Sequence, residues 1–208
     1  MRVVLTFILA FIYASSFGQL KIYKVDSANL PLKIKYEGHL INAVKWNDKL
    51  GLNYLITSET GNIQSKTINE EGYKDAALYA YHYIIKTDSL HLTWRLYDYN
   101  KECPLDLALY FLNNTFAITD LDKNAIAEVW MMYKNYCTGD VSPSPTKIIM
   151  YEGTKKYALR GESKVKFSAT EFVGGNFVLD ENFKKGKLVF REFAEKLWAK
   201  NKVEKWER

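Results

Sequence analysis

Residues 76–86 read AALYAYHYIIK, and this stretch decides the fold. Tyr79, Tyr81 and Tyr83 alternate with small and aliphatic residues, and only His82 and Lys86 are neither apolar nor aromatic. Period-two alternation with aromatic enrichment predicts a β-strand. Because both faces of this strand are largely apolar, we expect it to lie centrally in its sheet.

The same strand pattern continues on both sides of this stretch. The other predicted strands cover residues 40–46, 52–58, 91–99, 116–119, 129–134, 146–151 and 156–160. The sequences NDKLG at 47–51 and EGTK at 152–155 contain residues that tight turns prefer, so each predicts a hairpin. Residues 105–112 fit a strand or a short helical turn, residues 62–73 fit a loop or an edge strand, and residues 137–145 are expected to be irregular.

The pattern changes near the C-terminus, where residues 187–200 predict an amphipathic helix. The apolar positions that fall on one helical face are Leu188, Phe190, Phe193, Ala194, Leu197 and Trp198. The fold class that follows is α+β, with mostly antiparallel β-sheet and a C-terminal amphipathic helix.

Charge is concentrated in the same segment. Residues 184–208 hold nine Lys or Arg and four Glu, and so account for the chain's formal net charge of +5. The rest of the chain lacks the broad basic surface of a nucleic-acid-binding protein, and we expect no nucleic-acid partner. The basic helical face is either solvated or available to phosphates and anionic glycans.

Residues 1–18 have the composition of a cleavable signal peptide. Arg2 precedes the apolar run at 3–13, and the small residues Ser16 and Gly18 suit cleavage before Gln19. The apolar run is shorter than the roughly 20 residues of a membrane-spanning helix, although an uncleaved N-terminal anchor is the alternative. We therefore expect an extracytoplasmic protein, whether periplasmic, on the outer surface or secreted, with one globular domain at 19–208 and no transmembrane segment after cleavage.

The two cysteines of the chain, Cys103 and Cys137, take their meaning from that location. In an oxidising compartment two cysteines commonly pair, so a disulfide is predicted. Closing this loop would stabilise the fold by about 4 kcal/mol in the chain-entropy model. The alternative is a pair of buried free thiols.

Residues 120–128 read DLDKNAIAE and place oxygen ligands at alternate positions. The side chains of Asp120, Asp122, Asn124 and Glu128, with the backbone carbonyl of Ile126, would suit a calcium ion, which takes six to eight oxygen ligands. The spacing resembles the calcium loops that join two strands in integrin-type propeller repeats. Calcium is therefore the cofactor that the sequence suggests.

Two residues depart from the usual calcium-loop pattern. Ala125 occupies the sixth position, where glycine is usual because the chain turns there with positive φ. Met131 stands where the longer helix-loop-helix version has a bidentate Glu. The alternative interpretation is an acidic turn whose Asp and Asn side chains bond their own backbone.

Signatures of catalysis are absent from the sequence. No histidine pair has zinc spacing, and no nucleophile elbow, phosphate-binding glycine loop or dinucleotide fingerprint occurs. His82, between tyrosines on a strand, is expected to be a hydrogen-bonded core residue. A glycosidase would need two acids at a set separation, for which Asp98, Asp106 and Asp140 are candidates only because they are acidic. Whether the protein is an enzyme stays open.

Aromatic side chains offer a binding alternative. Tyr79, Tyr81, Tyr83 and Tyr97 would form a platform for the apolar faces of sugars if they were exposed. Rows of this kind otherwise belong to the core, because aromatic residues gain much from burial.

Four segments of the chain also carry a family resemblance. They read AVKWNDKLGLN at 43–53, ITDLDKN at 118–124, CTGDVSP at 137–143 and YALRG at 157–161. Together they resemble a family of exported proteins of Gram-negative bacteria labelled surface polysaccharide biosynthesis protein. That label implies a part in producing or displaying surface glycan and names no reaction, so it assigns no catalytic residue. The family pattern has glycine at the position of Ala125.

Three hypotheses of function follow. The first is an exported cell-envelope or secreted protein that supports surface-polysaccharide assembly or display by non-catalytic binding of a glycan or an envelope protein. The alternatives are a glycan-processing enzyme with paired carboxylates and a calcium-braced protein-interaction module.

Overall fold

The computed structural model describes residues 20–68, 70–87, 89–168 and 170–204. The predicted signal peptide at 1–18 lies outside these residues. Two antiparallel sheets dominate the fold. The first sheet contains β1 (Ile22–Lys24), β2 (His39–Asp48), β3 (Gly51–Glu59), β4 (Ile63–Gln64), β5 (Lys74–Lys86) and β6 (Ser89–Cys103). The second contains β7 (Asp106–Phe111), β8 (Ala117–Thr119), β9 (Glu128–Thr138), β10 (Pro145–Glu152), β11 (Lys155–Glu162) and β14 (Phe177–Leu179).

The smaller elements complete the chain. A short 3-10 turn, η1 (Ser27–Asn29), follows β1, and β12 (Lys164–Lys166) pairs with β13 (Phe172–Gly174) in a separate ribbon. The helices are α1 (Glu181–Lys185) and α2 (Leu188–Asn201). The predicted α+β class with mostly antiparallel sheet is therefore confirmed, and α2 matches the predicted helix to within a residue at each end.

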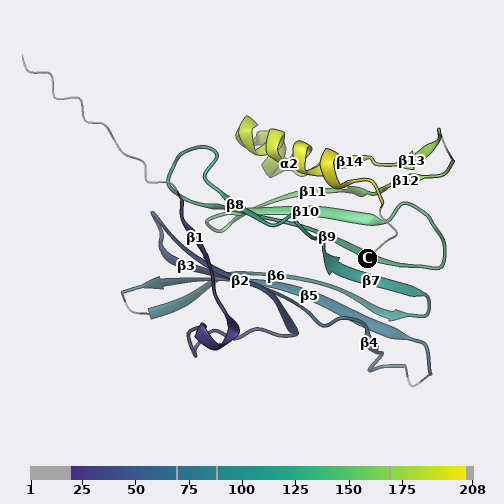
Figure 1. The fold of residues 1–208 in the computed structure, drawn as a ribbon, viewed down its shortest axis with the longest axis horizontal. Helices are drawn as coiled ribbons and strands as arrows, with labels where there is room; N and C mark the ends of the chain where they lie inside the picture. The colour runs from purple at the N-terminus through teal and green to yellow at the C-terminus, as the bar shows by residue number, and fades with distance from the viewer. Residues whose placement is uncertain (1–19, 69, 88, 169, 205–208) are drawn as a thin grey trace, which may run out of the picture.

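The two sheets pack face to face, and α2 lies on the outer side of the second sheet (Figure 1). Leu55 and Leu78 of the first sheet share the central core with Met131 and Ile149 of the second. A second cluster joins β9, β10 and β11 to the helices, and a third lies on the outer face of the first sheet. The decisive stretch, β5, pairs with β3 on one side and β6 on the other, as its two apolar faces predict.

Some segments without a clear local pattern became strands through long-range pairing. Residues 105–112 contain β7, which pairs with β9. That pairing also extends β9 through Cys137 and Thr138, so the expectation of irregular structure from residue 137 onward was wrong at its start. Residue 145, also expected to be irregular, begins β10. Hydrogen bonds to a partner strand override weak local preference here.

The predicted disulfide forms between Cys103 and Cys137, with Cα atoms 5.8 Å apart. Cys103 ends β6 in the first sheet and Cys137 lies in β9 of the second, so the bond joins the two sheets. Within the described residues, no helix combines the length and apolar composition that crossing a membrane requires.

Candidate functional site

Residues 120–128, which we call the Asp120 loop, lead from β8 into β9. These two strands pair as neighbours in the second sheet. Thr119 at the end of β8 lies opposite Glu128 at the start of β9, so the loop begins and ends at one point. Carboxylate oxygens of Asp120, Asp122 and Glu128 all lie within 4.8 Å of one another. These three residues could hold a metal ion.

The backbone of the loop makes the tight turn that the sequence predicts. Ala125 has φ of 64° and Lys123 has φ of 58°. Asp120 accepts hydrogen bonds from the backbone N–H groups of Asn124 (3.0 Å) and Ala125 (3.2 Å), and Asp122 accepts one from Asn124 (3.1 Å). The self-bonded acidic turn therefore forms, and the same turn gathers the carboxylates.

Asn124, another of the predicted ligands, makes its hydrogen bonds within the loop and to Glu152. The Asn124 side-chain oxygen accepts a hydrogen bond from the N–H of Ile126 at 2.7 Å. Its amide nitrogen donates to Asp122 at 3.1 Å and to Glu152 at 2.6 Å. Asn124 thus acts as a brace of the turn in this arrangement.

Glu128 is the residue of the Asp120 loop whose pKa is clearly shifted. Its side chain is completely buried. Burial raises the pKa of Glu128 to about 7, and the nearby charges of Asp122 and Asp120 act in the same direction. Thr119 donates to it at 2.7 Å and the N–H of Leu121 at 2.9 Å. A bound cation would stabilise carboxylates that are buried and close to one another.

Three residues from outside the loop complete it, and the loop motif alone could not identify them. Glu152 at the end of β10 lies opposite Glu128, and burial raises its pKa. Lys187, just before α2, pairs with Asp122. Asp48, the last residue of β2, accepts from the N–H of Ala127 at 3.1 Å. These contacts depend on strand register and on the packing of the two sheets.

The predicted tyrosine platform is mostly core. Tyr79, Tyr81 and Tyr83 are buried on the outer face of the first sheet, beneath residues that precede β2. The Tyr83 hydroxyl, for example, donates to the carbonyl of Lys35 at 2.7 Å. Tyr97 is the exception among the four, at 42% exposed.

At the exposed end of the tyrosine row, where Tyr99 is 51% exposed, neighbouring rings and two cations occupy part of the ring faces. Tyr79 stacks on Tyr97 with centroids 5.2 Å apart, and Tyr97 stacks on Tyr99 at 5.3 Å. Arg95 lies over Tyr97 at 5.2 Å and Lys101 over Tyr99 at 5.3 Å. Sugar stacking needs an open face, so this row serves packing better than glycan binding.

The carboxylate candidates do not form an acid–base pair. Asp98 lies between the sheets and binds Tyr133 at 2.9 Å and Lys147. Asp106 and Asp140 line a pocket of about 390 Å³ together with Glu204. A glycosidase acid must have a raised pKa. Hydrogen bonds from Ser142 and Thr138 instead lower the pKa of Asp140. Burial acts to raise the pKa of Glu204, but the bond from Lys134 and its other hydrogen bonds leave it lowered.

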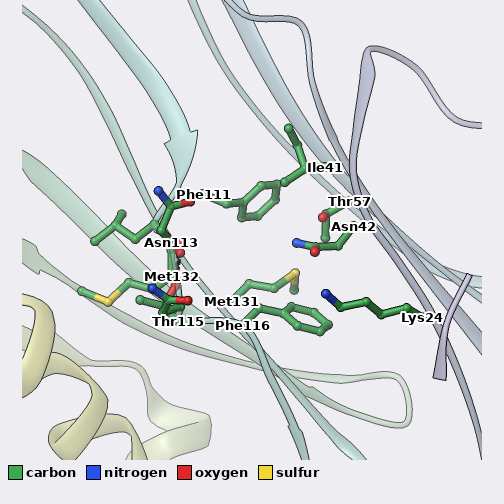
Figure 2. Close-up of a pocket in the computed structure, with 12 residues that line it drawn as sticks. Lys24, Ile41, Asn42, Thr57, Phe111, Asn113, Thr115, Phe116, Met131 and Met132 are labelled. Atoms are coloured by element: carbon green, nitrogen blue, oxygen red, sulfur yellow. Dashed lines mark hydrogen bonds between the residues drawn. The ribbon is translucent and has the colours of Figure 1, made fainter. Parts of the chain in front are cut away.

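A larger pocket, of about 530 Å³, opens between the two sheets. Figure 2 shows Lys24, Asn42 and Thr57 on the side of the first sheet, facing side chains of the second sheet and of the β7–β8 connection. The residues on that opposing side include Phe111, Asn113, Thr115, Phe116, Met131 and Met132. The wall from the first sheet is polar except for Ile41, and the other wall is mainly aromatic and aliphatic.

Strand pairing explains why polar groups point inward here. Side chains of directly paired residues lie on the same face of a sheet. Lys24 pairs with Val44, which is in the central core, and Asn42 pairs with Thr57, two residues along β3 from Leu55 of the same core. Inward positions of a packed sheet are normally apolar. The buried Thr57 and the half-buried Asn42 therefore interrupt the core, and the exposed Lys24 lies at its edge.

Thr57 is the most unusual residue of the pocket. It is 1% exposed, and its hydroxyl has no hydrogen-bond partner within the described part of the chain. An unpaired buried hydroxyl costs about 1–3 kcal/mol. Sequence reasoning missed this pocket, although Asn42 and Thr57 were detectable as polar residues inside predicted strands.

Comparisons with protein-family models, with curated proteins and with solved structures found no match to this chain. The function is therefore argued from the geometry of these sites.

Proposed function

We propose that this protein is an extracytoplasmic, non-catalytic glycan-binding protein that supports the assembly or display of a surface polysaccharide. The observation that carries the proposal is the pocket between the sheets, with the unpaired hydroxyl of Thr57 on its polar wall. The disulfide between Cys103 and Cys137 supports an oxidising location. The family resemblance supports the link to surface glycan.

The two walls of the pocket match the chemistry of a sugar ring. A pyranose has hydroxyl groups around its rim and apolar C–H groups on its faces. Asn42 and Thr57 offer hydrogen-bonding groups on one wall, and the rings of Phe111 and Phe116 offer apolar surface on the other. Ligand pockets of roughly 300–1,000 Å³ with a few convergent polar groups are typical of small-molecule sites.

Binding without chemistry is the better match to the acids at the two pockets. The described residues that line the pocket between the sheets include no carboxylate. In the pocket that Asp140 and Glu204 line, the pKa values of these two acids are lowered. Neither would hold the proton that a general acid must donate.

A titration of the purified protein with neutral and acidic methyl glycosides, followed by NMR, tests the proposal. Shifts of the resonances of Thr57 and Phe116 on addition of a glycoside are expected. The matched variant Thr57→Val keeps the shape of the side chain and removes the hydroxyl. It should weaken binding about fivefold to tenfold, the range for one lost hydrogen bond. Absence of binding by every glycoside tested would contradict the proposal.

Thr57→Val should also change the stability of the unliganded protein in the opposite direction. Removing an unpaired buried hydroxyl relieves its desolvation penalty, so the free energy of unfolding should rise by about 1 kcal/mol. Denaturant titration measures this change. A loss of stability would mean that an ordered water, and not a ligand, satisfies the hydroxyl.

As a second candidate function we propose that the Asp120 loop binds calcium. Asp120, Asp122 and Glu128 supply hard oxygen ligands, and the buried, crowded charge of Glu128 favours a cation. The ion would brace the β8–β9 connection against the end of β2 at Asp48.

Thermal unfolding at neutral pH tests the calcium site. Millimolar calcium should raise the melting temperature of the wild-type protein, and a chelator should lower it. Asp120→Asn should remove most of the response, whereas Asp106→Asn, outside the loop, should leave it intact. An identical melting temperature with calcium and with chelator would remove the calcium site and leave the glycan proposal untouched.

A further inference from the structure

Among the described residues that line the pocket between the sheets, Lys24 is the only ionisable one, and its side chain is exposed. It belongs to β1, an edge strand, and its pairing with Val44 directs it toward the second sheet. Figure 2 shows its amine pointing into the pocket near Asn42 and Met131. Across residues 20–204, apart from the few whose placement is not described, it forms no ion pair.

A second hollow adjoins the pocket, and the charged residues around the two differ. The pocket and this second hollow lie against the same segment, because Ile41 and residues 111–114 line both of them. The second hollow contains Glu59, whose carboxylate accepts from the N–H of Phe111 at 2.6 Å. The lysine that lines this second hollow, Lys134, forms an ion pair with Glu204. The unpaired Lys24 amine therefore draws an acidic ligand to its end of the pocket.

Building on the proposed glycan-binding function, we propose that this pocket selects a sugar unit that carries a carboxylate, of the uronic-acid class. The Lys24 amine pairs with the carboxylate, while Asn42 and the Thr57 hydroxyl bond ring hydroxyls. Phe111 and Phe116 cover an apolar face of the ring. A single lysine suits one carboxylate, since strong phosphate sites usually add arginine or several backbone N–H groups.

A simple carboxylic acid with an alkyl chain fits the pocket less well. Such a ligand needs apolar surface on all sides of its chain. Asn42 and Thr57 form part of one wall, so an alkyl chain would leave their polar groups without partners. A hydroxylated acid satisfies the amine and both polar side chains at once.

The test compares two ligands that differ only at one carbon, methyl β-glucuronide and methyl β-glucoside, by calorimetry or NMR titration at low ionic strength. The full chain should bind the glucuronide about tenfold more tightly, as expected for a hydrogen-bonded charge pair at a partly open site. Lys24→Gln should abolish the difference by weakening binding of the glucuronide. Lys45→Gln is the matched control, because Lys45 pairs with Tyr23 and lies on the opposite face of the first sheet.

The remaining outcomes separate this inference from the function it extends. Equal affinity for both glycosides, unaffected by Lys24→Gln, would overturn acid selectivity and leave glycan binding in place. Binding of neither glycoside would overturn both. Tighter binding of hexanoate than of the glucuronide would assign the pocket to apolar acids and overturn the inference. Unchanged circular dichroism and melting temperature of Lys24→Gln would show that the variant is folded.

Discussion

Ala125 holds φ of 64° at the tightest point of the Asp120 loop. A residue with a Cβ atom loses roughly 1 kcal/mol in this conformation relative to glycine. The sequence alone marks the position, because the sixth residue of such loops turns with positive φ. The structure adds that the carbonyl of Ala125 accepts from the N–H of Lys49 at 2.7 Å, so the neighbouring turn helps to hold it.

Ala125→Gly should therefore raise the free energy of unfolding by about 0.5–1 kcal/mol. The comparison is Ala127→Gly, two residues away, where φ is not positive and the methyl group is buried. That substitution should lower stability, because it removes buried surface and adds chain entropy. Denaturant titration of both variants would contradict this account if they moved in the same direction.

His82 fulfils the expectation of a core histidine. It is 3% exposed and lies between the rings of Trp46 and Trp94, at centroid distances of 5.5 and 5.1 Å. Its Nδ1 shares a hydrogen bond with the Thr93 hydroxyl. Burial lowers the pKa of His82 to about 4, with Asp48 acting weakly in the opposite direction.

This lowered pKa predicts a pH dependence of stability. The unfolded chain protonates His82 near its ordinary value of 6.5, whereas the folded protein resists protonation until about pH 4. The free energy of unfolding should thus fall by roughly 3 kcal/mol as the pH drops from 6.5 to 4. His82→Gln should lack this component. Parallel pH profiles for the two proteins would show that His82 does not contribute.

At the scale of elements, α2 docks on β11 through a position that admits no side chain. A Cβ atom at Gly161 would lie 2.1 Å from the backbone oxygen of Asn176 and 2.7 Å from the Trp198 ring. Trp198 is buried and donates from its indole nitrogen to the carbonyl of Gly175 at 3.1 Å. The helix can therefore approach the sheet only because residue 161 is glycine.

Gly161→Ala should lower the free energy of unfolding by about 2–3 kcal/mol, as overpacking against rigid neighbours does. Gly139→Ala is the control, since a Cβ there would make only ordinary contact with Leu105, at 3.5 Å. Chemical denaturation distinguishes the two. Similar, small effects at both positions would mean that the helix shifts freely on the sheet.

At the scale of the whole molecule, the disulfide is the covalent tie between the two sheets. It spans 34 residues from the end of β6 to β9 and encloses β7 and β8. Because the candidate pocket lies between the same sheets, the bond also restricts how far that pocket can open. Its effect on stability should come mainly from limiting the unfolded chain.

The double variant Cys103→Ala/Cys137→Ala should lose about 3–4 kcal/mol of unfolding free energy. The reduced wild-type protein provides the matched comparison, because it keeps both side chains. A loss below about 1 kcal/mol in both samples would mean that packing alone holds the sheets together.

Much of the fold was predictable from local sequence. The alternation in AALYAYHYIIK predicted β5, the turns NDKLG and EGTK predicted the β2–β3 and β10–β11 hairpins, and the helical period predicted α2. These signals depend on residues a few positions apart, so they can be recognised before any tertiary contact is known. Spacing also predicted that Asp120, Asp122 and Glu128 would converge.

The tertiary structure decided what local pattern could not contain. Lys24, Asn42 and Thr57 form one polar wall only because β1, β2 and β3 pair in a particular register. Glu152 meets the Asp120 loop through pairing with β9, and the buried tyrosines are covered by residues far away in the chain. Register and sheet packing follow from the sum of many weak, long-range contacts, to which no single short segment contributes enough to determine the outcome. The sequence by itself therefore determined most of the long strands and the C-terminal helix, while only the packed sheets determined which polar side chains line the candidate pocket.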